Sequence, residues 1–160
     1  MEQQALKQLV ADAALERVIE CPDDRFILGI GTGSTTEGFI RLLDKIRHRI
    51  ETTVSSSRRS ASLLRELGFT VDDLNQVPHV HFYVDGADEA NEQLQLIKGG
   101  GAALTREKIL ATVAEHFICI ADQSKKVKVL GGFPLPVEVI PMARSHVARE
   151  LTKLHSEPVW

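Results

Sequence analysis

Two carboxylates, a lysine and a run of glycines lie close together in residues 85–109, DGADEANEQLQLIKGGGAALTREKI. Asp85 and Asp88 follow an apolar run, and Lys98 precedes three consecutive glycines. Acids three residues apart can hydrogen-bond the hydroxyls of a sugar or hold a divalent cation, although a simple Asp-Gly turn also explains them. Three glycines in a row cost conformational entropy that a plain turn does not require, so they indicate close approach of a ligand to the backbone.

Glu107 belongs to a TREK sequence that opens the next predicted helix. Thr105 is expected to be the N-cap, which would place Glu107 at the second helical position. A capping box would need Glu or Gln at the position that Lys108 occupies, so that motif does not explain the glutamate. Glu107 can simply complement the helix dipole, and an ionised carboxylate there would equally suit a general base if it faces a crevice.

The sequence GTGSTT, residues 31–36, is a second candidate ligand-binding loop. Its glycines leave the backbone open, and its hydroxyl side chains stand at the start of a predicted helix, where an anion can bind. Turn glycines followed by a Ser or Thr N-cap are the simpler interpretation. The spacing of the glycines matches neither the dinucleotide-binding fingerprint nor a Walker A loop.

A third loop and a pair of histidines carry weaker signals. The sequence ADQSKK ends with Lys125 and Lys126 after a predicted strand, where a solvated charge pair is the default interpretation. One of these lysines could reach a phosphate if the other loops lie nearby. His79 and His81 share one face of a strand, but they lack a full ligand set, so no metal site is expected.

The elements around these loops alternate between strand and helix. Helical spacing of apolar residues predicts helices over residues 3–19, 39–46, 58–67, 105–116 and 142–154. Short apolar runs predict strands over residues 26–30, 52–55, 69–72, 79–88 and 117–122. This order predicts a doubly wound, mostly parallel, Rossmann-like α/β sheet. Because ligands bind at the carboxyl ends of such strands, the candidate loops should meet in one crevice.

The amino-acid composition of the chain changes after Lys128. Residues 1–128 are predicted to form the Rossmann-like catalytic domain. Residues 129–160 are rich in proline and then helical, which predicts the start of a small α+β subdomain that is incomplete here. One strand and one helix cannot bury their own apolar faces, so this second unit is not expected to be self-sufficient.

Composition narrows the class of protein. The chain has 160 residues, of which 43% are apolar, a net charge of −3 and a pI near 6.1. These values suit one hydrophobic core and no attraction to nucleic acid or anionic membrane. Cys21 and Cys119 form no motif, so a disulfide framework is not expected. We see no signal peptide or membrane-spanning run, and we therefore expect a cytoplasmic protein.

The sequences GTGST, DGADE, KGGGAALTREK, ADQSK and FPLPVEVIPMAR occur in this order, and with them the chain resembles ribose-5-phosphate isomerases of the A type. The resemblance implies an aldose–ketose isomerase that interconverts D-ribose 5-phosphate and D-ribulose 5-phosphate in the pentose phosphate pathway. It further implies no metal or organic cofactor and a homodimer or larger homo-oligomer. Members of this family continue well beyond residue 160, so the chain looks C-terminally truncated.

The resemblance also assigns roles to residues. Glu107 would be the proton acceptor, Asp85 and Asp88 would orient hydroxyls and assist ring opening, and Lys98 would stabilise the enediolate. Lys7 is a weaker candidate contact for the phosphate. The implied substrate-binding residues are Thr32, Gly33, Ser34, Thr35, Asp85, Gly86, Ala87, Asp88, Lys98, Gly99, Gly100, Gly101 and Lys125, with no metal ligands.

Two alternatives stay open from the sequence. One is a non-catalytic sugar-phosphate-binding protein, which includes an inactive, truncated homologue. The other is a different enzyme of the same architecture, such as a CoA transferase or a sugar-phosphate deaminase, each of which needs its own set of catalytic residues.

Overall fold

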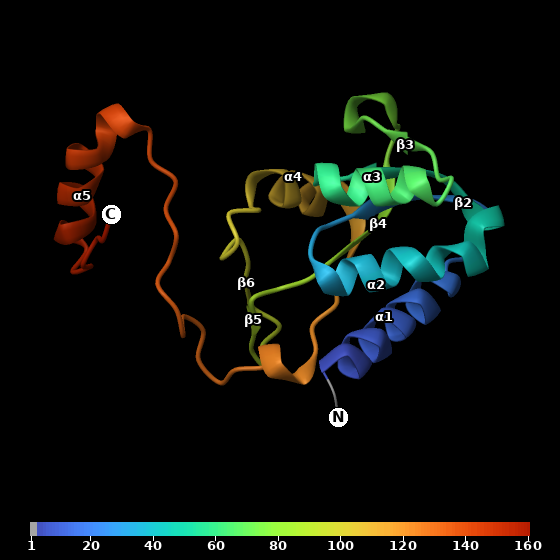
Figure 1. The fold of residues 1–160 in the computed structure, drawn as a ribbon, viewed down its shortest axis with the longest axis horizontal. Helices are drawn as coiled ribbons and strands as arrows, with labels where there is room; N and C mark the ends of the chain where they lie inside the picture. Colours follow the sequence, from blue (N-terminus) through green and yellow to red (C-terminus); the bar gives the residue numbers. More distant parts are fainter. Residues whose placement is uncertain (1–2) are drawn as a thin grey trace.

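The computed structural model describes residues 3–160, and its centre is a sheet of five parallel strands in the order β3-β2-β1-β4-β7 (Figure 1). These strands are β1 (Phe26–Ile30), β2 (Ile50–Ser55), β3 (Val71–Asp72), β4 (Val80–Asp85) and β7 (Ala114–Cys119). The helices are α1 (Gln3–Ile19), α2 (Ser34–Leu42), α3 (Arg58–Glu66), α4 (Thr105–Val113) and α5 (Arg144–Lys153). The predicted Rossmann-like α/β class is therefore confirmed.

Both faces of the sheet are covered, which explains why β1 is a continuous apolar run. All five residues of β1 are buried. Phe26, Leu28 and Ile30 pack in one cluster with α1 and α2, whereas Ile27 packs in a second cluster with Leu110 of α4. Since successive side chains of a strand point to opposite faces, the two clusters lie on opposite sides of the sheet.

The register of the strands aligns their carboxyl ends. Ile30 of β1 pairs with Ser55 of β2 and with Val84 of β4. Asp85 at the end of β4 pairs with Cys119 at the end of β7. The loops that follow these strands therefore leave the sheet at one edge, as the parallel topology requires.

Several predicted boundaries are wrong. The helix predicted over residues 105–116 ends at Val113, because Ala114 and the residues after it pair with β4 as strand β7. The N-cap of α4 is Leu104 instead of Thr105, so Glu107 stands third in the helix. The N-cap of α2 is Gly33, without a side-chain cap from Ser or Thr. Tertiary pairing and backbone geometry override local propensity at these points.

Four 3₁₀ segments, one of them kinked, complete the secondary structure. They are η1 (Leu43–Arg49), η2 (Leu74–Gln76), η3 (Gln123–Lys125) and η4 (Pro141–Ala143). The helix predicted over residues 39–46 is thus α2 continued by η1, which contains a non-helical residue at Ile46. The predicted helix over 142–154 corresponds to η4 followed by α5.

A small antiparallel hairpin, which the sequence did not predict, joins the DGADE segment to the KGGG segment. Its strands are β5 (Glu89–Ala90) and β6 (Leu96–Ile97), and Glu89 pairs with Ile97. The backbone N–H of Asp88 donates to the carbonyl of Ile97 at 2.8 Å. This hairpin brings the DGADE segment next to the KGGG segment, although eight residues separate them in sequence.

Residues 127–140 form no helix or strand and lead to α5, which lies apart from the sheet (Figure 1). The start of this segment is fixed by the buried carboxylate of Glu89, which accepts hydrogen bonds from the N–H groups of Gly131 and Gly132 at 2.7 and 2.9 Å. No residue of α5 is buried. Met142 is 97% exposed, so this part of the chain does not share the core.

None of the helices within residues 3–160 is both long enough and apolar enough to cross a membrane.

Candidate active site

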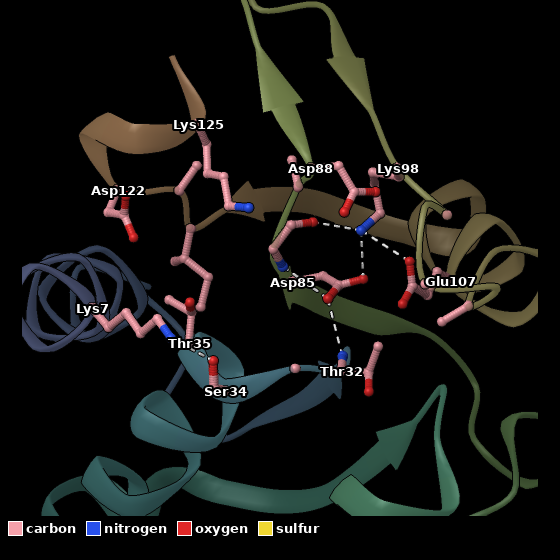
Figure 2. A pocket seen from close by; sticks show the side chains of 18 of the residues that line it. Lys7, Thr32, Ser34, Thr35, Asp85, Asp88, Lys98, Glu107, Asp122 and Lys125 are labelled. Carbon is pink, nitrogen blue, oxygen red and sulfur yellow. Dashed lines mark hydrogen bonds and ion pairs between the residues drawn. The ribbon is translucent and has the colours of Figure 1, made fainter. Parts of the chain in front are cut away.

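The candidate loops meet in one cavity of about 410 Å³ at the carboxyl edge of the sheet. Of the residues that the resemblance implicated, all but Gly100 line this cavity: Thr32, Gly33, Ser34, Thr35, Asp85, Gly86, Ala87, Asp88, Lys98, Gly99, Gly101, Glu107 and Lys125. Lys7 of α1 lines it as well. Four loops and two helices that are distant in sequence therefore build one site (Figure 2).

Asp85 ends β4 and is held at every acceptor position. Its Oδ1 accepts from the N–H groups of Thr32 and Gly86 at 3.0 and 2.8 Å. Its Oδ2 accepts from the hydroxyl of Tyr83 at 2.6 Å and from Nζ of Lys98 at 2.9 Å. The residue is 1% exposed. Since a carboxylate offers about four lone-pair positions, this shell is complete.

The glycine before this loop makes the shell possible. A Cβ added to Gly31 would lie 2.0 Å from Cγ of Asp85, which no real pair of atoms tolerates. The residue after β1 therefore has to be glycine for the Asp85 side chain to lie over the backbone at that point. Gly99 is required by its backbone conformation, because its φ of 90° falls in the left-handed region that favours glycine.

Lys98 bridges two carboxylates. Its Nζ lies 2.9 Å from Oδ2 of Asp85 and 2.9 Å from Oε2 of Glu107, and it also donates to the carbonyl of Gly86 at 2.5 Å. Burial alone would lower the pKa of Lys98, but the charges and hydrogen bonds of Asp85 and Glu107 outweigh it and raise the pKa. The lysine therefore stays a cation, fixed at the inner end of the cavity (Figure 2).

Glu107 is a buried carboxylate with a shifted pKa. Its side chain comes from the first turn of α4 and the residue is 4% exposed. Burial raises its pKa from 4.5 to about 7, the hydrogen bond from Lys98 opposes the rise, and the charge of Asp85 adds to it. Among residues 3–160, no hydrogen-bond donor reaches its Oε1. This oxygen is the free basic position of the site.

Asp88 and the glycine loop lie beside this pair. Oδ2 of Asp88 accepts from the N–H of Gly100 at 2.9 Å, which turns Gly100 away from the cavity and into a structural role. Gly99 and Gly101 on either side line the cavity with their backbone. Asp88 is only partly buried, and its Oδ1 has no donor within the described part of the chain.

The opposite end of the cavity is cationic. Nζ of Lys7 donates to Oγ of Ser34 at 2.8 Å, and the side chain of Lys125 extends into the cavity from the opposite side (Figure 2). Ser34 and Thr35 form the first turn of α2, whose N–H groups carry the positive end of the helix dipole. Two lysines, two hydroxyls and a helix start there supply positive charge and hydrogen-bond donors of the kind that suit an anion, and the carboxylate of Asp122 lines the same cavity.

The sequence analysis overlooked two residues that shape the site. Asp122 is 5% exposed and caps the turn that carries Lys125, because its carboxylate accepts from the N–H of Ser124 at 2.8 Å. Hydrogen bonds from the side chain and then from the N–H of Ser124 lower the pKa of Asp122. Tyr83 is fully buried behind Asp85. Alternation along β4 places Tyr83 and Asp85 on one face, and that signal was available in the sequence.

The histidine pair lies away from this cavity. Nδ1 of His81 accepts from the N–H of Ile27 at 2.9 Å, so the proton of the neutral ring is on Nε2, which lies 3.1 Å from Nε2 of His79. A protonated Nε2 cannot coordinate a metal. Across residues 3–160, no group of three or more His, Cys, Asp or Glu side chains could hold a metal ion.

Comparison with known proteins places the chain. The model of the ribose 5-phosphate isomerase A (phosphoriboisomerase A) family matches residues 52–160. The chain belongs to the ribose 5-phosphate isomerase A family. The predicted family is thereby confirmed.

Solved structures of ribose 5-phosphate isomerases agree with this membership. The enzyme from Neisseria gonorrhoeae is 47% identical with a TM-score of 0.86, and the match covers 95% of this chain and 66% of that one. A D-ribose-5-phosphate isomerase in complex with phospho-erythronic acid is 38% identical with a TM-score of 0.86, over 97% of this chain and 68% of that one. The enzyme from Methanocaldococcus jannaschii is 34% identical with a TM-score of 0.84, over 96% and 68%. The chain thus spans about two thirds of the length of these ribose 5-phosphate isomerases.

Proposed function

We propose that the chain is an aldose–ketose isomerase that interconverts D-ribose 5-phosphate and D-ribulose 5-phosphate. The observation that carries the proposal is Glu107, a buried carboxylate with a pKa of about 7 that faces a cavity with a cationic far end. The family of the chain supports this substrate. A D-ribose-5-phosphate isomerase that resembles this chain was solved in complex with phospho-erythronic acid, a phosphorylated sugar acid.

The proton transfer needs one base. Moving the carbonyl from C1 to C2 breaks the C2–H bond and forms a new C1–H bond, while the oxygen on C1 gains a proton and the oxygen on C2 loses one. A single carboxylate on one face of the planar enediolate can take the C2 proton and return it to C1. Oε1 of Glu107 is free for this, and a pKa near the working pH suits a general base.

The intermediate carries negative charge on oxygen, and the site holds donors for it. Lys98 supplies a partly buried cation beside Glu107, and the backbone of Gly99 and Gly101 lines the same cavity. Donors that are already fixed stabilise a developing oxyanion without the cost of reorganisation. We assign the enediolate oxygens to this part of the cavity.

Ring opening needs a separate acceptor, and the contacts favour Asp88 for it. The cyclic sugar must lose the proton of its anomeric hydroxyl while the ring oxygen receives one, and a single carboxylate can take the first proton and deliver it to the ring oxygen. Asp85 has no free acceptor position, because four donors fill its shell. Oδ1 of Asp88 is unoccupied among the described residues, so we assign the hydroxyl proton to Asp88 and an anchoring role to Asp85.

The phosphate belongs at the other end of the cavity. Lys7, Lys125, Ser34 and the start of α2 provide charge and donors there, remote from Glu107 (Figure 2). Binding a group far from the reacting carbons orients the substrate for the proton transfer.

Incubation of the purified chain with D-ribose 5-phosphate tests the proposal by the ketose that forms. Formation of ribulose 5-phosphate supports it, and turnover should persist when a chelator is present. Saturable binding of the phosphosugar without ketose formation would favour a non-catalytic sugar-phosphate-binding protein. Loss of turnover with the chelator would contradict the metal-free mechanism.

A further inference from the structure

Tyr83 lies behind Asp85, and the residues packed around its ring fix the position of the side chain. It is fully buried in β4, and its ring stacks on Phe117 of β7 with centroids 5.5 Å apart and planes at 23°. A Cβ added to Gly29 of β1 would lie 3.1 Å from its ring, so the glycine makes room for it. In this placement the phenol hydroxyl donates to Oδ2 of Asp85 at 2.6 Å.

The hydroxyl shares that oxygen with Lys98. Both groups donate to Oδ2 of Asp85, at 2.6 Å from Tyr83 and 2.9 Å from Lys98. With one lone pair filled by the phenol, one acceptor position of Oδ2 is left for the ammonium. The same ammonium lies 2.9 Å from Oε2 of Glu107, so Lys98 bridges the two carboxylates from that position.

The phenol is a donor at every working pH. Burial, followed by the charge of Asp85, raises the pKa of Tyr83 above its ordinary value, so the hydroxyl keeps its proton. A neutral donor stabilises the ionised form of Asp85 without adding a charge of its own. No position of Tyr83 touches the cavity, so it can act on the reaction only through Asp85 and Lys98.

We propose that Tyr83 is a positioning residue of the isomerase reaction: its hydroxyl completes the shell of Asp85 and so holds Lys98 between Asp85 and Glu107. The proposal rests on the proposed function for its catalytic consequence. The contact itself can be tested without turnover.

The kinetic test compares Tyr83→Phe with Phe117→Leu. The first removes the hydroxyl and keeps the ring, and the second removes the stacking partner and keeps the hydroxyl. A lost hydrogen bond to a charged group corresponds to a drop in kcat of about tenfold or more for Tyr83→Phe. Its KM should stay within about twofold, because the cationic end of the cavity is remote. Unchanged kcat, a change in KM alone, or an equal loss of kcat in Phe117→Leu would overturn the proposal.

A second test uses the fact that Tyr83 is the single tyrosine of the chain. Incorporation of 3-fluorotyrosine then gives one ¹⁹F signal that reports on the contact. The pKa values of Lys98 and Cys119 are raised, so Glu107 is the group of this network that titrates near pH 7. The signal should shift with a midpoint near pH 7, and the shift should vanish in Glu107→Gln.

The two tests fail separately. If the labelled protein shows no ¹⁹F shift near pH 7, or if the shift survives in Glu107→Gln, Tyr83 is not coupled to the catalytic pair and the proposal is wrong. If the unmodified chain forms no ketose, the proposed function fails, whereas the ¹⁹F titration still decides whether Tyr83 positions Asp85 and Lys98.

Discussion

Nζ of Lys98 lies 2.9 Å from Oε2 of Glu107, so a partly buried cation and a buried base share one hydrogen bond at the inner end of the cavity. The contact leaves Oε1 of Glu107 as the oxygen available to a substrate carbon. Burial and the charge of Asp85 raise the pKa of Glu107, and the hydrogen bond and charge of Lys98 oppose them, so that the pKa is about 7. The pair thus sets both the geometry and the acidity of the proposed base.

The first prediction concerns the pH dependence of turnover. Glu107 must be ionised to accept a proton, so kcat/KM should rise with pH and level off above its pKa of about 7. Initial rates between pH 5 and 9 at low substrate concentration give this profile. The second ionisation of the substrate phosphate, near pH 6, adds a separate limb that kcat at saturation does not share. A plateau that extends down to pH 5 would contradict the assignment.

The second prediction concerns stability. The pKa of Glu107 is raised from 4.5 to about 7 in the folded protein, so the folded state binds more protons between these values and stability falls as pH rises across this window. Glutamine cannot ionise. Glu107→Gln should therefore be more stable than the unmodified chain above pH 7, by on the order of 1–3 kcal/mol.

Denaturant unfolding at pH 5 and pH 8 measures this difference. The gain should be large at pH 8 and small at pH 5. Glu115→Gln, at an exposed position of β7, is the matched control and should show no such pH-dependent gain. A loss of stability in Glu107→Gln at pH 8 would show that the charge of Glu107 supports the fold.

The third prediction concerns Gly31. Gly31→Ala places a Cβ 2.0 Å from the carboxylate of Asp85, so the side chain or the backbone has to move. Overpacking of this kind costs about 1–3 kcal/mol of stability, and displacement of Asp85 should lower kcat as well. Thermal unfolding and steady-state kinetics measure both effects.

Gly38→Ala is the control for that variant. Gly38 lies inside α2, and an added Cβ there would meet only Cβ of Ala11 at 3.9 Å. Alanine in a helix interior should leave stability unchanged or raise it by about 0.5–1 kcal/mol. If the two alanine variants change stability by the same amount, Gly31 does not lie too close to Asp85 to accept a Cβ.

The fourth prediction concerns the cationic end. Lys125→Ala should raise KM for the phosphosugar at least about fivefold and change kcat by less than about threefold, because a phosphate contact acts equally on substrate and transition state. Inhibition by inorganic phosphate should weaken in parallel. Lys126→Ala is the control, since Lys126 ion-pairs with Glu92 outside the cavity. A fall in kcat without a change in KM would remove Lys125 from phosphate binding.

The sequence predicted the arrangement of the site better than the ends of its elements. The apolar run from Phe26 to Ile30 and the alternation of strands and helices were enough to place GTGSTT, DGADE and ADQSKK at one edge of a parallel sheet. That inference needs only the rule that such strands share a carboxyl edge. It does not depend on where each strand begins.

The sequence mispredicted secondary structure where contacts between residues distant in sequence determine it. Residues 114–116 have helical character in sequence, yet they are strand because Val80 and Phe82 pair with Ala114 and His116. The β5–β6 hairpin rests on two residue pairs, too few to leave a periodic pattern. Alternation along β4 puts Tyr83 on the same face as Asp85, but the sequence does not show that the phenol donates to Oδ2 of Asp85.

Deuterium exchange tests the central claim most directly, namely that Glu107 transfers a proton between adjacent carbons of a phosphosugar. D-ribose 5-phosphate is incubated in deuterium oxide with the unmodified chain and with Glu107→Gln, and label at the carbon next to the carbonyl is followed by NMR. We predict incorporation with the unmodified chain and a rate at least about 100-fold lower with Glu107→Gln, although that variant still binds the substrate. Equal rates of exchange in the two proteins would contradict the role of Glu107, and binding without exchange in the unmodified chain would contradict the isomerase itself.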